Sequence, residues 1–210
     1  MTTTYDADLA LFINGSWQIG EGRDLFPVVN PASGETIAEV PLATPSDLDA
    51  ALHAADAGFK LWKATPVDQR AAVLKRAATL IRERAESIAT LLTLEQGKVL
   101  AEARAEVLSS AQIFDWCAEE ASRTYGRVLV RPTGQRSMVL KQPVGPVATF
   151  SPWNFPVYLI AKKLAPALAV GCSVIAKPPE ETPGCTGALM RCLDDAGLPK
   201  PLDLYAVDVL

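Results

Sequence analysis

Two short polar turns in the second half of the chain carry residue types suited to ligand binding. The first comprises residues 151–156 (SPWNFP) and follows a near-continuous apolar run. The amide of Asn154 is a neutral two-proton donor at a predicted helix start, suited to stabilising a developing oxyanion or to capping the helix. Pro156 and Trp153 also have ordinary explanations, as a helix-starting proline and a core aromatic residue.

The second turn comprises residues 177–180 (KPPE) and follows another apolar run. Lys177 and Glu180 are held near one another by two prolines and can bind the hydroxyls of a ribose. The alternative is a solvated charged loop between a strand and a helix. If both turns leave one parallel sheet, they lie at the edge where such sheets bind ligands.

The cysteines and the histidine give no sign of a metal site. Cys117, Cys172, Cys185 and Cys192 form no C-x-x-C pair, and the single histidine, His53, has no cysteine near it in sequence. We expect reduced, structural thiols, and a surface or packing role for His53 in its alanine-rich helix.

Composition favours a small-molecule ligand. The net charge is −4, and no Lys/Arg-rich run offers a face for nucleic acid or an anionic membrane. Residues 1–9 lack the features of a signal or transit peptide. The longest uncharged apolar stretch, between Lys163 and Lys177, is shorter than the roughly 18 residues that a membrane span needs. We therefore expect a cytoplasmic protein.

The first half of the chain predicts short strands followed by helices. Residues 11–17 alternate around an Asn-Gly pair, which is a hairpin signal, and residues 30–34 (NPASG) are typical of a turn. Three helices in one layer are then predicted. The first starts at Thr44 and buries Leu48, Leu52, Ala55, Phe59 and Trp62; the second runs from Thr65 to Gly97; the third runs from Val99 to about Tyr125, with Gly126 as its cap.

The second half predicts a β-arm followed by an α/β unit. Residues 128–131 and 137–141 are short β-like runs around a Pro-Thr-Gly turn. Strands at 144–151 and 172–176 alternate with helices at 156–170 and 182–196, the last closed by Gly197. Strand, helix, strand, helix is typical of a doubly wound parallel sheet.

Several segments of the sequence resemble the NAD(P)-dependent aldehyde dehydrogenase superfamily. The resemblance is carried by residues 142–199, by the run 95–98 (EQGK), and by residues 30–34 and 12–15. Among subgroups, the sequence is similar to succinate-semialdehyde-type dehydrogenases and their aliphatic relatives. The resemblance implies an α/β fold with an incomplete Rossmann-type parallel sheet, an N-terminal helical layer and a β-arm at about 127–142.

The resemblance also implies roles for individual residues. Asn154 is the expected side-chain member of the oxyanion hole, and Lys177 and Glu180 are expected at the adenosine ribose. The nicotinamide side of the cofactor groove is expected to be lined by Phe150, Ser151, Pro152 and Trp153. Glu180 would repel a 2′-phosphate while Lys177 would attract it, so NAD is favoured and NADP is the alternative.

The resemblance leaves the catalytic thiol unaccounted for. In the family a cysteine thiolate attacks the aldehyde, and a glutamate activates the water that hydrolyses the thioester. None of the four cysteines has the glycine- and glutamine-flanked context of that nucleophile. Residues 1–199 resemble the family's N-terminal part, whereas residues 200–210 depart from it. We therefore expect a truncated, weakly stable chain with an uncovered edge after the strand at 172–176.

Three functions remain open from sequence alone. The first is membership of an NAD(P)-dependent aldehyde dehydrogenase that oxidises an aldehyde to a carboxylate, inactive as this chain alone. The second is a non-catalytic module that binds NAD or pairs with an intact subunit. The third is a gene remnant. By resemblance, the arm predicts a homo-oligomer in a full-length relative.

Overall fold

The centre of the fold is a five-stranded sheet that joins both ends of the chain. The computed structural model describes residues 4–19, 22–200 and 203–205. The strands are β1 (Leu11–Ile13), β2 (Ser16–Gln18), β7 (Val147–Phe150), β8 (Val174–Lys177) and β9 (Asp203–Tyr205). Their order is β2-β1-β9-β8-β7, with β7, β8 and β9 parallel. The α/β class predicted from the sequence is confirmed.

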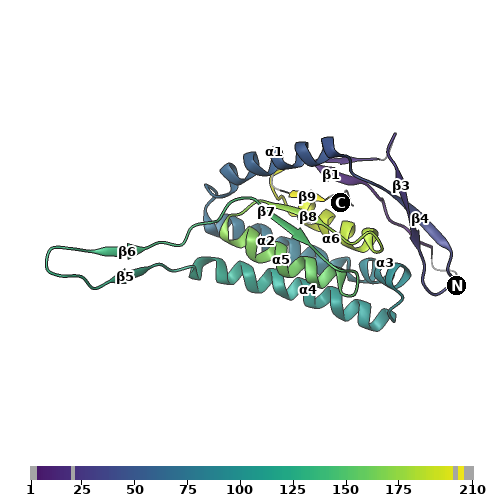
Figure 1. Ribbon diagram of the computed structural model, residues 1–210. Helices are drawn as coiled ribbons and strands as arrows, with labels where there is room; N and C mark the ends of the chain where they lie inside the picture. The colour runs from purple at the N-terminus through teal and green to yellow at the C-terminus, as the bar shows by residue number, and fades with distance from the viewer. Residues whose placement is uncertain (1–3, 20–21, 201–202, 206–210) are drawn as a thin grey trace.

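Helices cover both faces of this sheet. They are α1 (Pro45–Trp62), α2 (Val67–Glu83), α3 (Ala85–Gln96), α4 (Leu100–Glu120), α5 (Pro156–Val170) and α6 (Pro183–Asp195). Figure 1 shows α1 on one side of the sheet and α5 and α6 on the other, while α2, α3 and α4 pack against α5 and α6. The predicted single layer of N-terminal helices is therefore wrong, because α1 packs on the opposite face. None of the described helices is long and apolar enough to cross a membrane.

The N-terminal hairpins form as the sequence predicts. β1 and β2 pair antiparallel around Asn14 and Gly15, whose φ angles of 50° and 74° suit the tight turn that Asn-Gly favours. A second antiparallel pair, β3 (Leu25–Val29) and β4 (Thr36–Pro41), is joined by the predicted turn. In that turn Asn30 Oδ1 accepts a hydrogen bond of 2.9 Å from the backbone N–H of Ala32.

The start of α1 is fixed by a capping box. The Thr44 hydroxyl accepts a hydrogen bond from the backbone N–H of Asp47, and the Asp47 carboxylate accepts one from the backbone N–H of Thr44. The predicted buried face is partly wrong, because Leu48 and Leu52 are exposed. Small residues bury instead and bring the helix close to the sheet: Ala51, Ala54, Ala55 and Gly58, together with Trp62.

The second predicted helix is two helices. α2 ends at Glu83 and α3 begins at Ala85, with Arg84 between them at φ −99° and ψ 11°. Neither proline nor glycine marks this break in the sequence. Arg84 makes an ion pair of 2.6 Å with Asp195 on α6, so contacts with another helix accompany the change of direction. Gly97, at φ +86°, ends α3 as predicted.

The third predicted helix ends earlier than expected. α4 stops at Glu120 and a 3₁₀ turn follows at Ala121–Arg123. Gly126 is not the left-handed cap that we predicted. A Cβ atom at Gly126 would lie 2.3 Å from the carbonyl oxygen of Val139, so this glycine allows two backbones to approach closely.

The predicted arm is a two-stranded hairpin that projects from the body. β5 (Arg127–Leu129) pairs antiparallel with β6 (Ser137–Val139), and Figure 1 shows this pair reaching well away from the helices and the sheet. Large apolar side chains on the arm are exposed: Val128, Val130, Met138 and Leu140. Such a surface is typical of a contact with another chain.

The predicted α/β unit is confirmed with small changes at its boundaries. β7 and β8 pair in parallel, connected by α5, and α6 follows β8. Beyond β8 the prediction of an uncovered edge is wrong, because β9 pairs with β8 on one side and with β1 on the other. Residues 203–205, in the segment that we expected to depart from the family, thus form a strand between β1 and β8.

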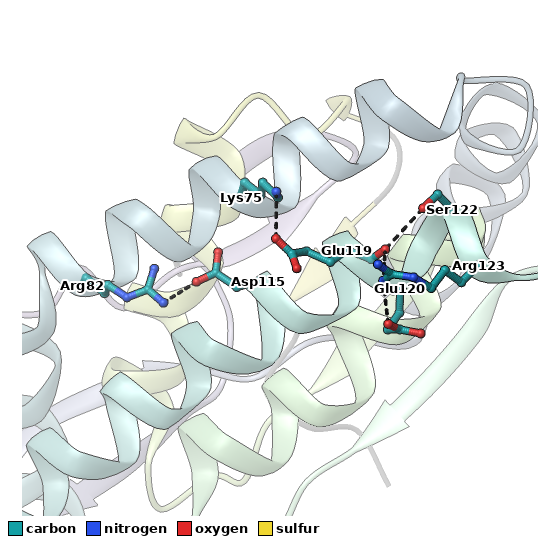
Figure 2. Close-up of polar contacts among 7 residues, drawn as sticks. All are labelled: Lys75, Arg82, Asp115, Glu119, Glu120, Ser122 and Arg123. Carbon is teal, nitrogen blue, oxygen red and sulfur yellow. Dashed lines mark hydrogen bonds and ion pairs between the residues drawn. The ribbon is translucent and has the colours of Figure 1, made fainter.

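Exposed ion pairs join α2 to α4 on the outer surface. Figure 2 shows Lys75 reaching Glu119 and Arg82 reaching Asp115. These side chains are 38–61% exposed, so water screens the pairs and each adds little to stability. The apolar contacts beneath them, including the fully buried Leu74 and Phe114, are the larger contribution.

Candidate functional site

The carboxyl ends of β7 and β8 bring the two predicted turns together. Phe150 at the end of β7 pairs in register with Lys177 at the end of β8. The backbone N–H of Ser151 donates to the carbonyl oxygen of Lys177 over 3.3 Å. Because the strands are parallel, residues 151–155 and 178–182 leave the sheet at the same edge, where ligands bind in doubly wound folds.

The first turn presents apolar rings beside one buried hydroxyl. Phe150, Pro152 and Trp153 are exposed, whereas Ser151 is buried. The Oγ atom of Ser151 has no hydrogen-bond partner within the described part of the chain. Flat apolar faces next to an unsatisfied buried donor are suited to a planar ligand with a polar substituent.

Lys177 and Glu180 form an ion pair with one another. Lys177 Nζ lies 2.8 Å from Glu180 Oε2, and the two side chains are 25% and 30% exposed. Burial raises the pKa of Glu180, but the hydrogen bond and positive charge of Lys177 lower it, and the net pKa lies below its ordinary value. The pair leaves little net charge at this position of the sheet edge.

Asn154 lies in a cleft between the first turn and α4. The cleft has a volume of about 670 Å³ and is lined by Lys98, Glu102, Ala105, Glu106, Ser109, Asn154, Phe155, Tyr158 and Leu159. Asn154 is exposed, and no hydrogen bond of its side-chain amide is found among the residues that the structure describes. Its amide is therefore available to a ligand in the cleft.

A buried glutamate, and not Asn154, caps α5. Glu106 on α4 accepts hydrogen bonds from the backbone N–H groups of Val157 and Tyr158, over 3.0 and 3.1 Å. Its other carboxylate oxygen lies 2.6 Å from Lys98 Nζ. Of the two uses of the Asn154 amide left open by the sequence, helix capping is thus taken by another residue.

A second glutamate caps α6 in the same way. Glu95 accepts hydrogen bonds from the backbone N–H groups of Gly184 and Cys185, over 2.6 and 2.9 Å, and from the Tyr5 hydroxyl over 2.6 Å. Burial raises the pKa of Glu95 against the opposing effect of these hydrogen bonds. Because both helix N-termini already hold a protein carboxylate, neither offers free N–H groups to a phosphate.

Sequence reasoning missed the roles of Glu95 and Glu106. Glu95 belongs to the run 95–98 that carried the family resemblance, but nothing local indicates which groups it contacts. Glu106 lies in an ordinary amphipathic helix, and the N–H groups that it accepts from come 51 and 52 residues later. Side-chain caps between elements so far apart leave no local pattern in a single sequence.

The cleft continues as a groove between α4 and α5. A neighbouring hollow of about 390 Å³ shares Ser109 and Tyr158 with the cleft and adds Gln112, Ile113, Trp116, Cys117, Lys162 and Pro166. The Nζ atom of Lys162 lies 5.3 Å from the centroid of the Tyr158 ring. A cation on an exposed side chain therefore stands along the path that leads away from Asn154.

The four thiols are buried, as expected for structural cysteines. Cys117, Cys172, Cys185 and Cys192 are free and none lines the cleft around Asn154. Burial raises the pKa of Cys117 and of Cys192 to about 11, which disfavours the reactive thiolate. His53 is exposed on α1, with Nδ1 2.7 Å from the carbonyl oxygen of Asp49, which fits a surface role.

Comparison with known proteins places the chain among dehydrogenases. The model of the aldehyde dehydrogenase family matches residues 17–202. The chain is 48% identical to a 4-(hydroxymethyl)benzenesulfonate dehydrogenase of Comamonas testosteroni over 185 residues, which is 88% of this chain and 39% of that protein. It is 38% identical to the succinate-semialdehyde dehydrogenase (NADP(+)) of Escherichia coli strain K12 over 188 residues, 89% of this chain and 39% of that one.

A solved structure is also similar to the fold. An aldehyde dehydrogenase from Brucella melitensis biovar abortus 2308 matches with a TM-score of 0.95 and 38% identity, covering 100% of this chain and 44% of that one. The chain thus spans about 39% of the length of the curated relatives named above. The similarity to succinate-semialdehyde dehydrogenases and to an N-terminal part of such proteins, predicted from the sequence, is confirmed.

Proposed function

The chain belongs to the aldehyde dehydrogenase family, and from this premise we propose that residues 150–180 supply an oxyanion donor and part of a dinucleotide groove for NAD(P)-dependent aldehyde oxidation. The observation that carries the proposal is the free amide of Asn154 in a cleft beside the open ends of β7 and β8. Glu106 takes over the capping of α5, so the amide of Asn154 is not needed for it.

The residues at the sheet edge fit a nicotinamide dinucleotide. Phe150 and Trp153 offer exposed rings to a planar heterocycle, and the unpartnered Ser151 hydroxyl offers a polar contact beside them. Lys177 and Glu180 carry both a donor and an acceptor for ribose hydroxyls. When bound, the dinucleotide would accept a hydride from the substrate carbon. Its phosphates need donors other than the N-termini of α5 and α6, which Glu106 and Glu95 occupy.

Asn154 is proposed to stabilise negative charge on the aldehyde oxygen. Attack of a thiolate on an aldehyde carbon turns the carbonyl oxygen into an oxyanion, and a fixed amide N–H at that point lowers the energy of the transition state. Removing one such donor typically costs about 3 kcal/mol.

We propose that the 210-residue chain does not oxidise aldehydes by itself. The reaction needs a thiolate opposite Asn154, and none of the four cysteines lines its cleft. The pKa values of about 11 at Cys117 and Cys192 further disfavour a nucleophile. The activity inherited from the family is then expressed only where another part of the polypeptide, or another chain, brings a reactive cysteine to the cleft.

The class of substrate proposed is an aldehyde with an anionic tail. The names of the two relatives described above state substrates with an anionic group, a sulfonate in one and a carboxylate in the other. In this chain Lys162 lies in the groove that continues from Asn154 between α4 and α5. A cation at that position attracts the tail of a substrate whose aldehyde carbon is held at Asn154.

A second candidate function is a pairing module, favoured by the arm. The exposed apolar side chains of β5, β6 and their loop suit contact with a second copy or with a longer relative. This function needs no catalysis by the chain itself. It is compatible with dinucleotide binding, because the arm and the sheet edge are separate parts of the structure, as Figure 1 shows.

Calorimetric titration of the purified chain with NAD and NADP tests the main proposal. We expect saturable binding of a dinucleotide, and no NADH or NADPH formation when an aldehyde is added. Replacing the Glu180 carboxylate in Glu180→Gln should shift the ratio of NADP to NAD affinity upward roughly fivefold, since the charge facing a 2′-phosphate is lost. Lys75→Gln, in an exposed ion pair on α2, is the control that should change neither affinity.

The result that would contradict the proposal is a folded chain with no binding heat for either dinucleotide. In that case the pairing function would be the one left to test. Aldehyde oxidation by the wild-type chain, lost on replacement of one of its own cysteines, would contradict the proposed inactivity.

A further inference from the structure

Lys98 stands where three segments of the chain meet. It follows Gly97 at the end of α3, and its ammonium group lies 2.6 Å from Glu106 Oε2 on α4. It also donates a hydrogen bond of 3.0 Å to the backbone carbonyl oxygen of Asn154, and it lies 4.0 Å from the centroid of the Phe155 ring. One cation therefore contacts two consecutive residues of the turn that carries the proposed oxyanion donor.

Glu106 holds the other side of the same turn. Its side chain is 1% exposed, and that of Lys98 is 8% exposed, so both charges are shielded from water. The carboxylate joins Lys98 to the backbone N–H groups of Val157 and Tyr158 at the start of α5. A buried pair of this kind is geometrically demanding, because breaking it strands an unpaired charge.

Asn154 is itself one of the residues held by Lys98, just before the start of α5. The turn is otherwise exposed: Pro152, Trp153 and Asn154 face solvent. The backbone of Asn154 fixes the Cα and Cβ atoms from which its amide extends, and a misplacement of about one ångström in a catalytic group lowers the reaction rate strongly. A contact that fixes the carbonyl of residue 154 therefore has a consequence beyond stability.

We propose that Lys98, locked by Glu106, is a positioning residue that sets the orientation of the Asn154 amide in the cleft. The inference rests on the proposed role of Asn154. Lys98 acts through the turn and not on the aldehyde carbon. If it served folding alone, its loss would lower stability and leave the folded geometry around Asn154 unchanged.

Selective labelling makes the orientation of Asn154 directly measurable. Asn14, Asn30 and Asn154 are the asparagines of the sequence, so a chain labelled with [15N]asparagine gives one pair of side-chain amide signals for each. Asn154→Asp identifies the signal of interest by its disappearance. In Lys98→Met we expect the Asn154 amide signals to move and broaden, while those of Asn14 on the β1–β2 turn stay in place.

Matched variants separate positioning from a general loss of stability. Lys98→Arg keeps a cation for Glu106, for the carbonyl and for the ring, so it should return the Asn154 signals to near their wild-type positions. Glu106→Gln, which keeps the length of the side chain, should move them as Lys98→Met does. Lys75→Met is the control, because it removes a lysine that also pairs with a glutamate on α4, shown in Figure 2, but at an exposed site on α2.

If a charge variant fails to fold, a second measurement tests the contact between Lys98 and the Phe155 ring. Phe155 is half exposed, so Phe155→Leu should keep the wild-type fold. The ε-methylene protons of Lys98 should be shifted upfield by the Phe155 ring in the wild-type chain and lose that shift in Phe155→Leu.

Two results would overturn the proposal. One is an unmoved Asn154 signal in a folded Lys98→Met or Glu106→Gln chain, and the other is the absence of the ring shift in the wild-type chain. These measurements need no dinucleotide. Moved Asn154 signals together with silent calorimetry would therefore count against the proposed function and leave the coupling of Lys98 to Asn154 intact.

Discussion

At the scale of single residues, Lys162 in the groove next to Asn154 is proposed to bind the anionic tail of the substrate. Its exposed side chain lines the groove next to the cleft, with the ammonium group over the Tyr158 ring. Lys162→Met should weaken binding of succinate semialdehyde roughly fivefold, the magnitude of an exposed charge contact of about 1 kcal/mol. Ligand-observed NMR titration measures the affinity of the wild-type chain and of Lys162→Met for succinate semialdehyde.

Butanal, an uncharged aldehyde of the same carbon number, should bind the wild-type chain and Lys162→Met equally. Lys60→Met, on α1, is a matched lysine replacement away from the groove and should leave both ligands unaffected. If succinate semialdehyde binds Lys162→Met as well as it binds the wild-type chain, the anionic tail lies elsewhere.

The sequence predicted the turn residues of the site better than the residues that support them. Asn154, Lys177 and Glu180 lie at the sheet edge where parallel-strand topology puts them, because strand ends can be read from local apolar runs. Glu95 and Glu106 could not be predicted, since their partners are side by side only after four helices have packed. The chemical roles assigned to Asn154, Lys177 and Glu180 remain proposals.

At the scale of elements, the capping box of α1 links acidity to stability. Hydrogen bonds from Arg23 and Thr44 hold the pKa of Asp47 well below its usual range, despite its partial burial. A carboxyl with a lowered folded pKa contributes stability above its unfolded pKa of about 3.9, and this contribution is lost as the pH falls toward the folded value.

Asp47→Asn should therefore lower the free energy of unfolding by about 1–2 kcal/mol at neutral pH. The difference from the wild-type chain should shrink below about pH 4, where the wild-type carboxylate begins to lose its own contribution. Urea unfolding followed by circular dichroism across this pH range measures it. Asp49→Asn, two residues later and exposed, should change stability little. A constant difference at every pH would show that the charge of Asp47 is unimportant.

Helix starts and turns were predictable because their signals are local. The start of α1 is indicated by Thr44, Pro45 and Asp47, and the first hairpin is indicated by Asn14-Gly15. The break at Arg84 has no such signal, since an ion pair with α6 accompanies it. The exposed Leu48 and Leu52 were misassigned because close packing on the sheet prefers the alanine face of α1, a choice that depends on the distance between layers.

At the scale of the whole molecule, the arm is the part most suited to association. Val130 is fully exposed and Val128 is 74% exposed, so isolated chains leave apolar surface in water. The double replacement Val128→Lys with Val130→Lys should reduce self-association, measured by sedimentation velocity over a range of concentrations. Val144→Lys, at an equally exposed valine outside the arm, is the control. Unchanged sedimentation of the arm variant would exclude the arm as the contact.

The order of strands in the sheet was the least predictable feature. β7 and β8 are consecutive strands of the predicted α/β unit and were predicted as neighbours, whereas β9 lies in a segment for which we predicted no strand. Its place between β1 and β8 depends on a pairing of Phe12 with Tyr205 across nearly the whole chain. No periodicity within a short window can indicate such a partner.

That pairing has a consequence for biosynthesis. A ribosome releases β1 and β2 early, but their place in the sheet is formed by β9, which leaves the exit tunnel about 190 residues later. Until then the inner edge of the first hairpin has no neighbour, and non-local closure of this kind slows folding. The central sheet can therefore close only when synthesis of the chain is nearly complete.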